Sequence, residues 1–399
     1  MQRRARLGPL HGVPFGVKDT HYTKGIRTTA NTPVLADFIP DFDATVVAKL
    51  KHAGGVLLGK MKLPEFSFGS AGEGGAFPDA KNPWNVSRTP GGSSSGSAAA
   101  LAAGFLTVAT GGDTSGSIRN PATFCGVVGM KPTYGRVSRR GIVVISWSLD
   151  HVGPMTRTVA DNAMLLNAIA GHDPADDTSS AMPVPDFTRA LRRGARGMRI
   201  GIPKAAQFEG YHADVMHAYR DALDVFRQLG AAVEEVDLPD TSDVIDDVQS
   251  IVRIAEAASY HEPFLATKAD RYGLTSVRRD VEAGSLVTAV QYLRAQKVRA
   301  QFTRALETTF GRLDVFVTPG MPAPAGERIE VKQPFRRMFN VCGFPALVLP
   351  MGFSSSPPGL PLGLQIAAKP SDEESIYAAA QAFESATEWH RRRPDLSAH

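Results

Sequence analysis

Short apolar runs that predict β-strands alternate with segments of helical periodicity, and this alternation limits the possible fold more than any other feature. Strands are expected at residues 13–19, 56–59, 106–109, 199–203, 233–236, 314–317 and 362–366, with 56–59, 314–317 and 362–366 buried. Helices are expected at residues 44–52, 97–103, 158–171, 214–229 and 372–390. The pattern predicts an α/β fold: a twisted, mostly parallel or mixed sheet with helices on both faces.

The 399 residues are expected to form a single domain. No internal repeat divides the chain, and the Pro-, Gly- and Ser-rich stretch at 354–361 is typical of a loop rather than a domain linker. Residues 173–312 are more polar and more helical than the rest. We expect this stretch to be a sub-region that shapes a substrate pocket.

The composition is that of a soluble globular protein, with 43% apolar and 21% charged residues. A net charge of +4, spread over the whole length, does not indicate binding to nucleic acid or to a membrane. Cys125 and Cys342 have no metal-ligand spacing and are expected to be thiols in a reducing compartment. The longest mostly apolar run, 97–112, is too short to span a membrane. These features predict a cytoplasmic protein.

Two loops of small residues, separated by one predicted helix and one predicted strand, carry the strongest functional signal. The first is Gly91-Gly92-Ser93-Ser94-Ser95-Gly96-Ser97 and the second is Gly111-Gly112-Asp113-Thr114-Ser115-Gly116-Ser117-Ile118-Arg119. Small residues let backbone N–H groups approach a ligand closely, and such groups ahead of a hydroxyl can form an oxyanion hole. Upstream, Lys18 ends an apolar strand. Burial there would lower its pKa and make it a base near neutral pH.

Other interpretations of the same residues remain open at this point. The first loop also fits the G-x-S-x-G nucleophile elbow, with Ser94 at its centre and His151, His172 or His390 as partner. It could instead be a Gly/Ser linker, or a P-loop, although the P-loop lysine is missing. Asp113 and Arg119 are expected to brace the second loop by hydrogen bonds.

At these residues the chain resembles the amidase signature family. The resemblance covers residues 8–19, 59–60, 65–66, 82–85, both loops, 124–133, 148–150, 340–346 and 359–365. It is weak only at about 173–312, and motifs of this length in this order are highly specific. The resemblance implies the amidase-signature fold and the hydrolysis of a carboxylic-acid amide C–N bond.

The resemblance also implies a role for each matching residue. Ser117 is the expected nucleophile, Ser93 the bridging serine with a cis peptide bond, and Lys18 the base. The backbone N–H groups of Thr114, Ser115, Gly116 and Ser117 are expected to form the oxyanion hole. The implied chemistry requires no metal and no organic cofactor.

Two departures from the family pattern stand out. Position 115 is Ser where the family usually has Gly, and only 17 residues precede Lys18, so the domain is expected to be short at its N-terminus. The family includes the glutamine-hydrolysing A subunit of a tRNA-dependent amidotransferase. The Arg-x-Met-Leu-Gly-Thr segment that helps this family member to bind glutamine is absent, since the region reads Arg278-Arg279-Asp280-Val281.

We therefore expect a stand-alone amidase, with the glutamine-hydrolysing amidotransferase component as the alternative and a Ser94 esterase as a more distant one. The expected partner is a small-molecule amide, with neither nucleic acid nor membrane and with a homodimer as a possible assembly. The acyl group and the substrate-binding residues are not determined by the sequence. Phe66, Phe68, Trp84 and Trp147 are candidates for an apolar pocket and equally for the core.

Overall fold

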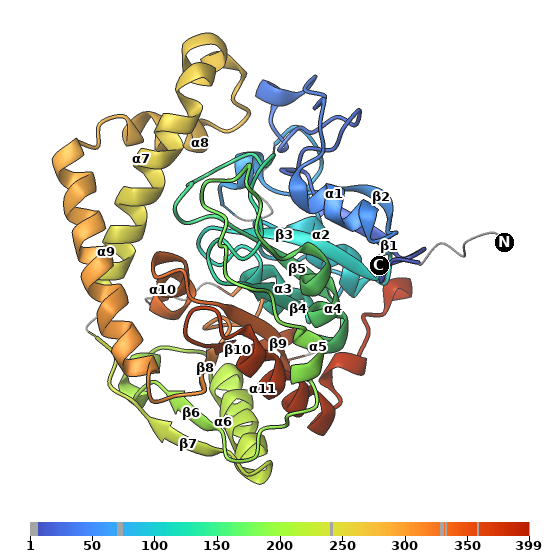
Figure 1. Ribbon diagram of the computed structural model, residues 1–399, viewed down its shortest axis with the longest axis vertical. Helices are drawn as coiled ribbons and strands as arrows, with labels where there is room; N and C mark the ends of the chain where they lie inside the picture. Colours follow the sequence, from blue (N-terminus) through green and yellow to red (C-terminus); the bar gives the residue numbers. More distant parts are fainter. Residues whose placement is uncertain are drawn as a thin grey trace.

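One mixed sheet of ten strands runs through the protein (Figure 1). The computed structural model describes residues 7–69, 75–239, 242–327, 331, 333–356 and 359–398. The strands are β1 (Pro14–Lys18), β2 (Val56–Met61), β3 (Val108–Asp113), β4 (Val128–Lys131), β5 (His151–Thr156), β6 (Arg199–Ile202), β7 (Ala232–Glu235), β8 (Val315–Pro319), β9 (Ala346–Phe353) and β10 (Pro361–Ala367). Their order across the sheet is β2-β1-β3-β5-β4-β9-β10-β8-β6-β7.

Strand direction changes across this sheet. At one end β1 lies parallel to both β2 and β3, and at the other end β6 lies parallel to both β7 and β8. The strands between them, from β3 through β5, β4, β9 and β10 to β8, pair antiparallel. The prediction of an α/β fold with a mixed sheet is confirmed.

Helices cover both faces of the sheet. They are α1 (Thr45–His52), α2 (Ser95–Ala102), α3 (Arg119–Cys125), α4 (Val159–Ile169), α5 (Phe187–Ala190), α6 (Ala213–Gln228), α7 (Ser242–Lys268), α8 (Thr275–Gly284), α9 (Ala289–Phe310), α10 (Pro334–Val341) and α11 (Glu373–Ala386). Side chains alternate along β9: Leu347 and Leu349 belong to the cluster that includes α4, α6 and α11, whereas Val348 belongs to the cluster of α2 and α3. Successive residues of a strand point to opposite faces, so these helix groups pack on opposite sides.

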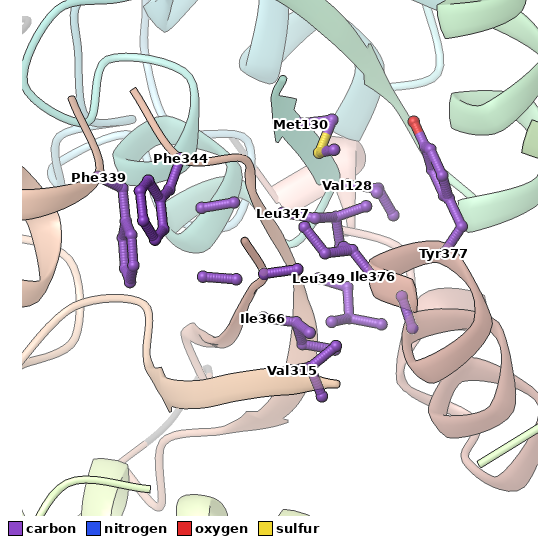
Figure 2. Close-up of a cluster of buried hydrophobic side chains, with 14 of the residues drawn as sticks. Val128, Met130, Val315, Phe339, Phe344, Leu347, Leu349, Ile366, Ile376 and Tyr377 are labelled. Atoms are coloured by element: carbon purple, nitrogen blue, oxygen red, sulfur yellow. The ribbon is translucent and has the colours of Figure 1, made fainter. Parts of the chain in front are cut away.

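The larger cluster lies between the central strands and α11 (Figure 2). Leu347 and Leu349 of β9 and Ile366 of β10 meet Ile376 and Tyr377 of α11, and all five are at most 1% exposed. This continuous apolar contact fixes the sheet on which the functional loops stand.

Helices α8 and α9 each pack on α7 beside the sheet, and α7 also contacts α10 (Figure 1). They belong to the stretch 173–312 that the sequence marks as more helical. That stretch also supplies β6 and β7 to the main sheet and α6 to its surface, so it is partly built into the core. None of the helices in the described ranges has the length and apolar character that crossing a membrane requires.

Three predicted elements differ from the observed ones. The strand expected at 106–109 is β3, which extends to Asp113 and so includes Gly111 and Gly112, expected in the second loop. The strand predicted as buried at 56–59 is present as β2, but it is the edge of the sheet, and Val56 and Leu58 are 49% and 59% exposed. The last helix ends at Ala386 rather than at residue 390, because Thr387 has extended backbone angles.

Candidate active site

Lys18 lies at the carboxyl end of β1, beside the loops that follow β3. Because β1 and β3 are parallel, their carboxyl ends meet at the same edge of the sheet. The Lys18 side chain is buried, with the residue 2% exposed, and its Nζ donates a hydrogen bond to Oγ of Ser93 at 2.6 Å. The structure therefore brings together two residues that are far apart in the sequence.

Burial lowers the pKa of Lys18 to about 7, although the nearby carboxylates of Asp150 and Asp113 act in the opposite direction. A lysine with this pKa has a large neutral fraction at neutral pH and can accept a proton. This is the charge state that a general base needs.

The first small-residue loop holds Ser93 in place before α2. The Gly92–Ser93 peptide bond is cis, as the resemblance implied. Gly91 has a φ of +80°, and a Cβ there would lie 2.5 Å from Oδ1 of Asn120, so this position requires glycine. The same Asn120 oxygen accepts a hydrogen bond from the Gly92 N–H at 2.8 Å.

Ser117 lies between β3 and α3, where it lines a cavity. Its carbonyl oxygen accepts a hydrogen bond from the Ser94 N–H at 3.1 Å, which joins the two loops. Within the described residues, the hydroxyls of Ser93 and Ser117 are not hydrogen-bonded to each other. The structure thus contains the Lys18–Ser93 contact and places Ser117 on the cavity wall.

Of the four backbone N–H groups in residues 114–117 that are expected to form an oxyanion hole, one already has a partner within the loop. Gly116 donates its N–H to Oδ1 of Asp113 at 2.7 Å, so that group is already occupied. The N–H groups of Thr114, Ser115 and Ser117 donate to no other described residue. Asp113 organises this loop and leaves the remaining N–H groups available to a ligand.

A buried ion pair supports Asp113. Nε and Nη2 of Arg119 donate to its two carboxylate oxygens at 3.0 and 3.1 Å. Arg119 also donates to Oε1 of Gln365 at 2.7 Å and to Oδ1 of Asn340 at 2.7 Å, which links the loop to β10 and α10. Burial by itself raises the pKa of Asp113, but the Arg119 guanidinium and the hydrogen bonds outweigh it and lower the pKa overall. The expected bracing role of both residues is confirmed.

Side chains of the loop are also held. Thr114 Oγ1 donates to Oδ1 of Asp150 at 2.6 Å. Gln249 of α7 donates from Nε2 to the Ser115 hydroxyl at 2.5 Å. Ser115 has no positive φ, so the serine fits where the family usually has glycine.

The cavity in front of Ser117 has a volume of about 400 Å³. Its lining is mainly polar and comes from both loops, the segment 67–69, Ile145, and the helices α7, α8 and α10: Ser67, Phe68, Gly69, Gly92, Thr114, Ser115, Ser117, Ile145, Gln249, Ser250, Arg253, Ser276, Val277, Asp280, Arg336 and Arg337. Three arginines and one aspartate are among these residues. The cavity is therefore charged, unlike the apolar pocket that aromatic residues would form.

Of the four aromatic residues considered for an apolar pocket, only one lines the cavity. Phe68 lines the cavity, whereas Phe66 is fully buried in a separate core cluster and Trp84 packs on Phe353. Trp147 is 54% exposed and does not line the cavity. The sequence analysis missed Gln249, Arg253, Arg336 and Arg337, although the Arg336-Arg337 pair directly precedes the recognised segment at 340–346.

The Ser94 alternative has no support in the structure. Ser94 is buried, and its hydroxyl donates to the Gly112 carbonyl at 3.2 Å and accepts from the Gly112 N–H at 3.1 Å. Within the described chain, no strand precedes it between residues 79 and 94, and it does not line this cavity. A nucleophile elbow needs both features.

Comparison with known proteins agrees with this geometry. The family model described as Amidase matches residues 1–377. The A subunit of glutamyl-tRNA(Gln) amidotransferase from Moorella thermoacetica is 43% identical, over 99% of this chain and 86% of that protein. The crystal structure of the corresponding protein from Thermotoga maritima superposes with a TM-score of 0.81 at 36% identity, over 96% of this chain and 84% of the other. Native peptide amidase from Stenotrophomonas maltophilia gives a TM-score of 0.85 at 32% identity, over 98% of this chain and 85% of that chain.

One expectation from the sequence is contradicted by these relatives. We expected a small-molecule amide as the partner, no nucleic acid, and a homodimer as a possible assembly. The relatives at 41–43% identity are instead named as one subunit of an amidotransferase for glutamyl-tRNA(Gln). The prediction rested on the net charge of +4 spread over the whole length, which says little about the partners of a single chain.

The family itself is settled by the match along most of the chain and by relatives above 40% identity that cover nearly all of it. The fold, with its mixed sheet between helices, agrees with that match. This chain belongs to the amidase family, whose signature its sequence carries.

Proposed function

We propose that this protein hydrolyses an amide C–N bond through an acyl-enzyme on Ser117, with Lys18 and Ser93 carrying the proton. The observation that supports this most strongly is the 2.6 Å hydrogen bond from Lys18 Nζ to Ser93 Oγ. A buried lysine of lowered pKa beside a serine, with a second serine on the wall of a cavity, matches the requirements of an activated nucleophile.

In the acylation step, neutral Lys18 accepts the Ser93 proton while Ser93 accepts the Ser117 proton. The Ser117 oxygen then attacks the amide carbonyl carbon, and the resulting oxyanion is held by the free N–H groups of the 114–117 loop. Breaking the C–N bond releases the amine or ammonia with a proton returned through the relay. Water repeats the sequence on the ester and releases the carboxylic acid and Ser117.

We propose L-glutamine as the amide, with a biological role as the glutamine-hydrolysing component of a tRNA-dependent amidotransferase. Support comes from the relatives of that name at 41–43% identity, which match almost the whole chain. A charged cavity also suits an amino acid better than it suits an aliphatic amide.

A stand-alone amidase is the second candidate. It is favoured by α8, where Arg278-Arg279-Asp280-Val281 replaces the glutamine-binding segment, and by the 32% identity to a peptide amidase. Release of ammonia from L-glutamine by the purified chain, compared with release from neutral amides, separates the two. The amidotransferase candidate predicts that the chain works with partner B and C subunits encoded beside its gene. Glutamine hydrolysis that occurs only when those subunits are added would support that candidate.

The nucleophile can be tested directly with a fluorophosphonate, followed by peptide mass spectrometry. Ser93, Ser94 and Ser117 fall in one tryptic peptide, residues 89–119, so a second cleavage before Asp113 is needed. A label on Ser117 supports the mechanism. A label on Ser94, or no label on folded protein, contradicts it.

Two further points complete the proposal. The single domain uses the 173–312 stretch to shape the substrate pocket, since Gln249, Arg253 and Asp280 from it line the cavity. We place the enzyme in the cytoplasm, which agrees with the two free cysteines.

A further inference from the structure

The cavity wall carries more positive than negative charge. Two of its three arginines have carboxylate partners: Arg253 lies 3.6 Å from Asp280, and Arg337 lies 2.8 Å from Asp246. Among the described residues, Arg336 forms no ion pair. The surplus charge of the cavity is therefore located on one side chain.

The guanidinium of Arg336 is also short of hydrogen bonds. Its Nε is buried and has no hydrogen-bond partner in the described part of the chain. Burial lowers the pKa of Arg336 to about 10, assisted by the neighbouring charges of Arg337 and Arg119. The group remains charged at neutral pH. The residue as a whole is only partly buried and lines the cavity, so an anionic ligand there could supply the missing partner.

The Arg336 side chain lies against the 114–117 loop. A Cβ at Gly116, whose φ is +106°, would lie 2.4 Å from Cγ and 2.9 Å from Cδ of Arg336. The stem of Arg336 therefore crosses the residue that precedes Ser117, and both Arg336 and Ser117 line the same cavity. Glycine at 116 is what leaves room for this approach.

The backbone of Arg336 is fixed by the same network that supports the 114–117 loop. Nη2 of Arg119 donates to the Arg336 carbonyl oxygen at 2.8 Å. Nε2 of Gln365 donates to the carbonyl oxygen of the preceding Phe335 at 3.1 Å. The start of α10 is thus held against the loop, and Arg336 is positioned before a ligand arrives.

We propose that Arg336 binds a carboxylate group of the amide substrate and so makes the enzyme prefer amides that carry a carboxylate over neutral amides. A guanidinium presents a planar fork that matches a carboxylate in two hydrogen bonds. This inference rests on the proposed amide hydrolysis and adds the substrate class and the residue that selects it. Glutamine is one member of that class.

The test compares two amides of equal carbon number, 4-carbamoylbutanoate, which carries a carboxylate, and pentanamide, which does not. The wild type should have a higher kcat/KM for 4-carbamoylbutanoate. Arg336→Met keeps an unbranched stem over Gly116 but removes the charge. It should reduce the ratio of the two kcat/KM values by about tenfold to a hundredfold, mainly through KM.

Two variants serve as comparison. Arg336→Lys should retain part of the preference, because it keeps the charge and loses only the fork. Arg304→Met makes the same replacement on the exposed surface of α9 and should leave the ratio unchanged. Equal losses for both amides in Arg336→Met would overturn the proposal and assign Arg336 to supporting the loop.

A binding measurement separates this inference from the proposed reaction. By calorimetry, the Ser117→Ala variant should bind 4-carbamoylbutanoate more tightly than pentanamide, and Ser117→Ala/Arg336→Met should lose that difference. Equal affinities, or no measurable affinity for the carboxylate, overturn the role of Arg336 even when the fluorophosphonate labels Ser117. Selective binding without any labelling of Ser117 supports the role of Arg336 and contradicts the acyl-enzyme.

Discussion

The side-chain amide of Gln249 donates a 2.5 Å hydrogen bond to the hydroxyl of Ser115, and this contact joins α7 to the loop ahead of Ser117. Ser115 occupies a position where related enzymes usually have glycine. The extra hydroxyl gives α7 a direct hydrogen bond to the 114–117 loop. Movement of this helix would therefore reach the backbone groups that are proposed to hold the oxyanion.

Replacing Gln249 by leucine should reduce kcat about fivefold with little change in the melting temperature, since a typical hydrogen bond contributes about 1 kcal/mol. Ser115→Gly removes the other partner. Steady-state kinetics of both variants and of the double variant form a cycle, and the double variant should lose less than the product of the two single losses. Fully multiplicative losses would show that the contact does not matter for the reaction.

The proposed relay predicts a graded loss of activity. Lys18→Ala and Ser117→Ala should each reduce kcat by at least about a thousandfold, because one removes the base and the other the nucleophile. Ser93→Ala should also cripple the enzyme, since it breaks the path between them. Circular dichroism should show native folds for all three variants. Substantial activity in Lys18→Ala would refute the relay.

Activity should rise with pH through about 7 and level off above it, because the pKa of Lys18 is lowered to about 7 mainly by burial. Below that pH the lysine is protonated and cannot accept a proton; above it the neutral base is present. The rate of fluorophosphonate labelling, measured from about two pH units below this pKa to about two above it, reports this step without product release. A labelling rate that does not change across this range in folded protein is incompatible with Lys18 as the base.

Breaking the Arg119–Asp113 pair should destabilise the protein strongly. Arg119→Met leaves the Asp113 carboxylate buried without its cation, which costs about 3–5 kcal/mol of the free energy of unfolding. The matched control is Arg189→Met, whose partner Asp186 is exposed, so its loss should change the free energy of unfolding far less than Arg119→Met does. Urea unfolding measures both. Similar costs for the two variants would contradict a structural role for the buried pair.

The two small-residue loops could be recognised in the sequence because the backbone conformations they adopt depend on local composition. Gly91 and Gly116 have positive φ angles and no room for a Cβ, so both positions require glycine. The apolar strand before Lys18 indicates that this lysine is buried. The helix expected to begin at residue 158 does so because of a local cap: the Thr158 hydroxyl accepts a hydrogen bond from the Asp161 N–H at the start of α4.

Other features depend on contacts that the sequence does not reveal. β4, β5 and β9 were not predicted, because each is short or interrupted by Gly and Pro and is stabilised by pairing with its neighbours in the sheet. The exposure of β2 follows from its place at the edge, which requires the strand order. The charged cavity is assembled from α7, α8 and α10 around Ser117, and only the folded chain brings these arginines together.

This construction of the cavity has a consequence for how such an enzyme can diversify. Lys18 ends β1 and its hydrogen-bond partner Ser93 lies beside it, whereas much of the cavity wall around Ser117 belongs to helices beside the sheet. If the cavity binds the substrate, substitutions on α7 or α8 can change which acyl group binds there without changing Lys18, Ser93 or Ser117. The residues proposed to break the amide bond and the helices that line the cavity thus belong to different segments of the chain. Two proteins with the same signature can therefore act on different amides.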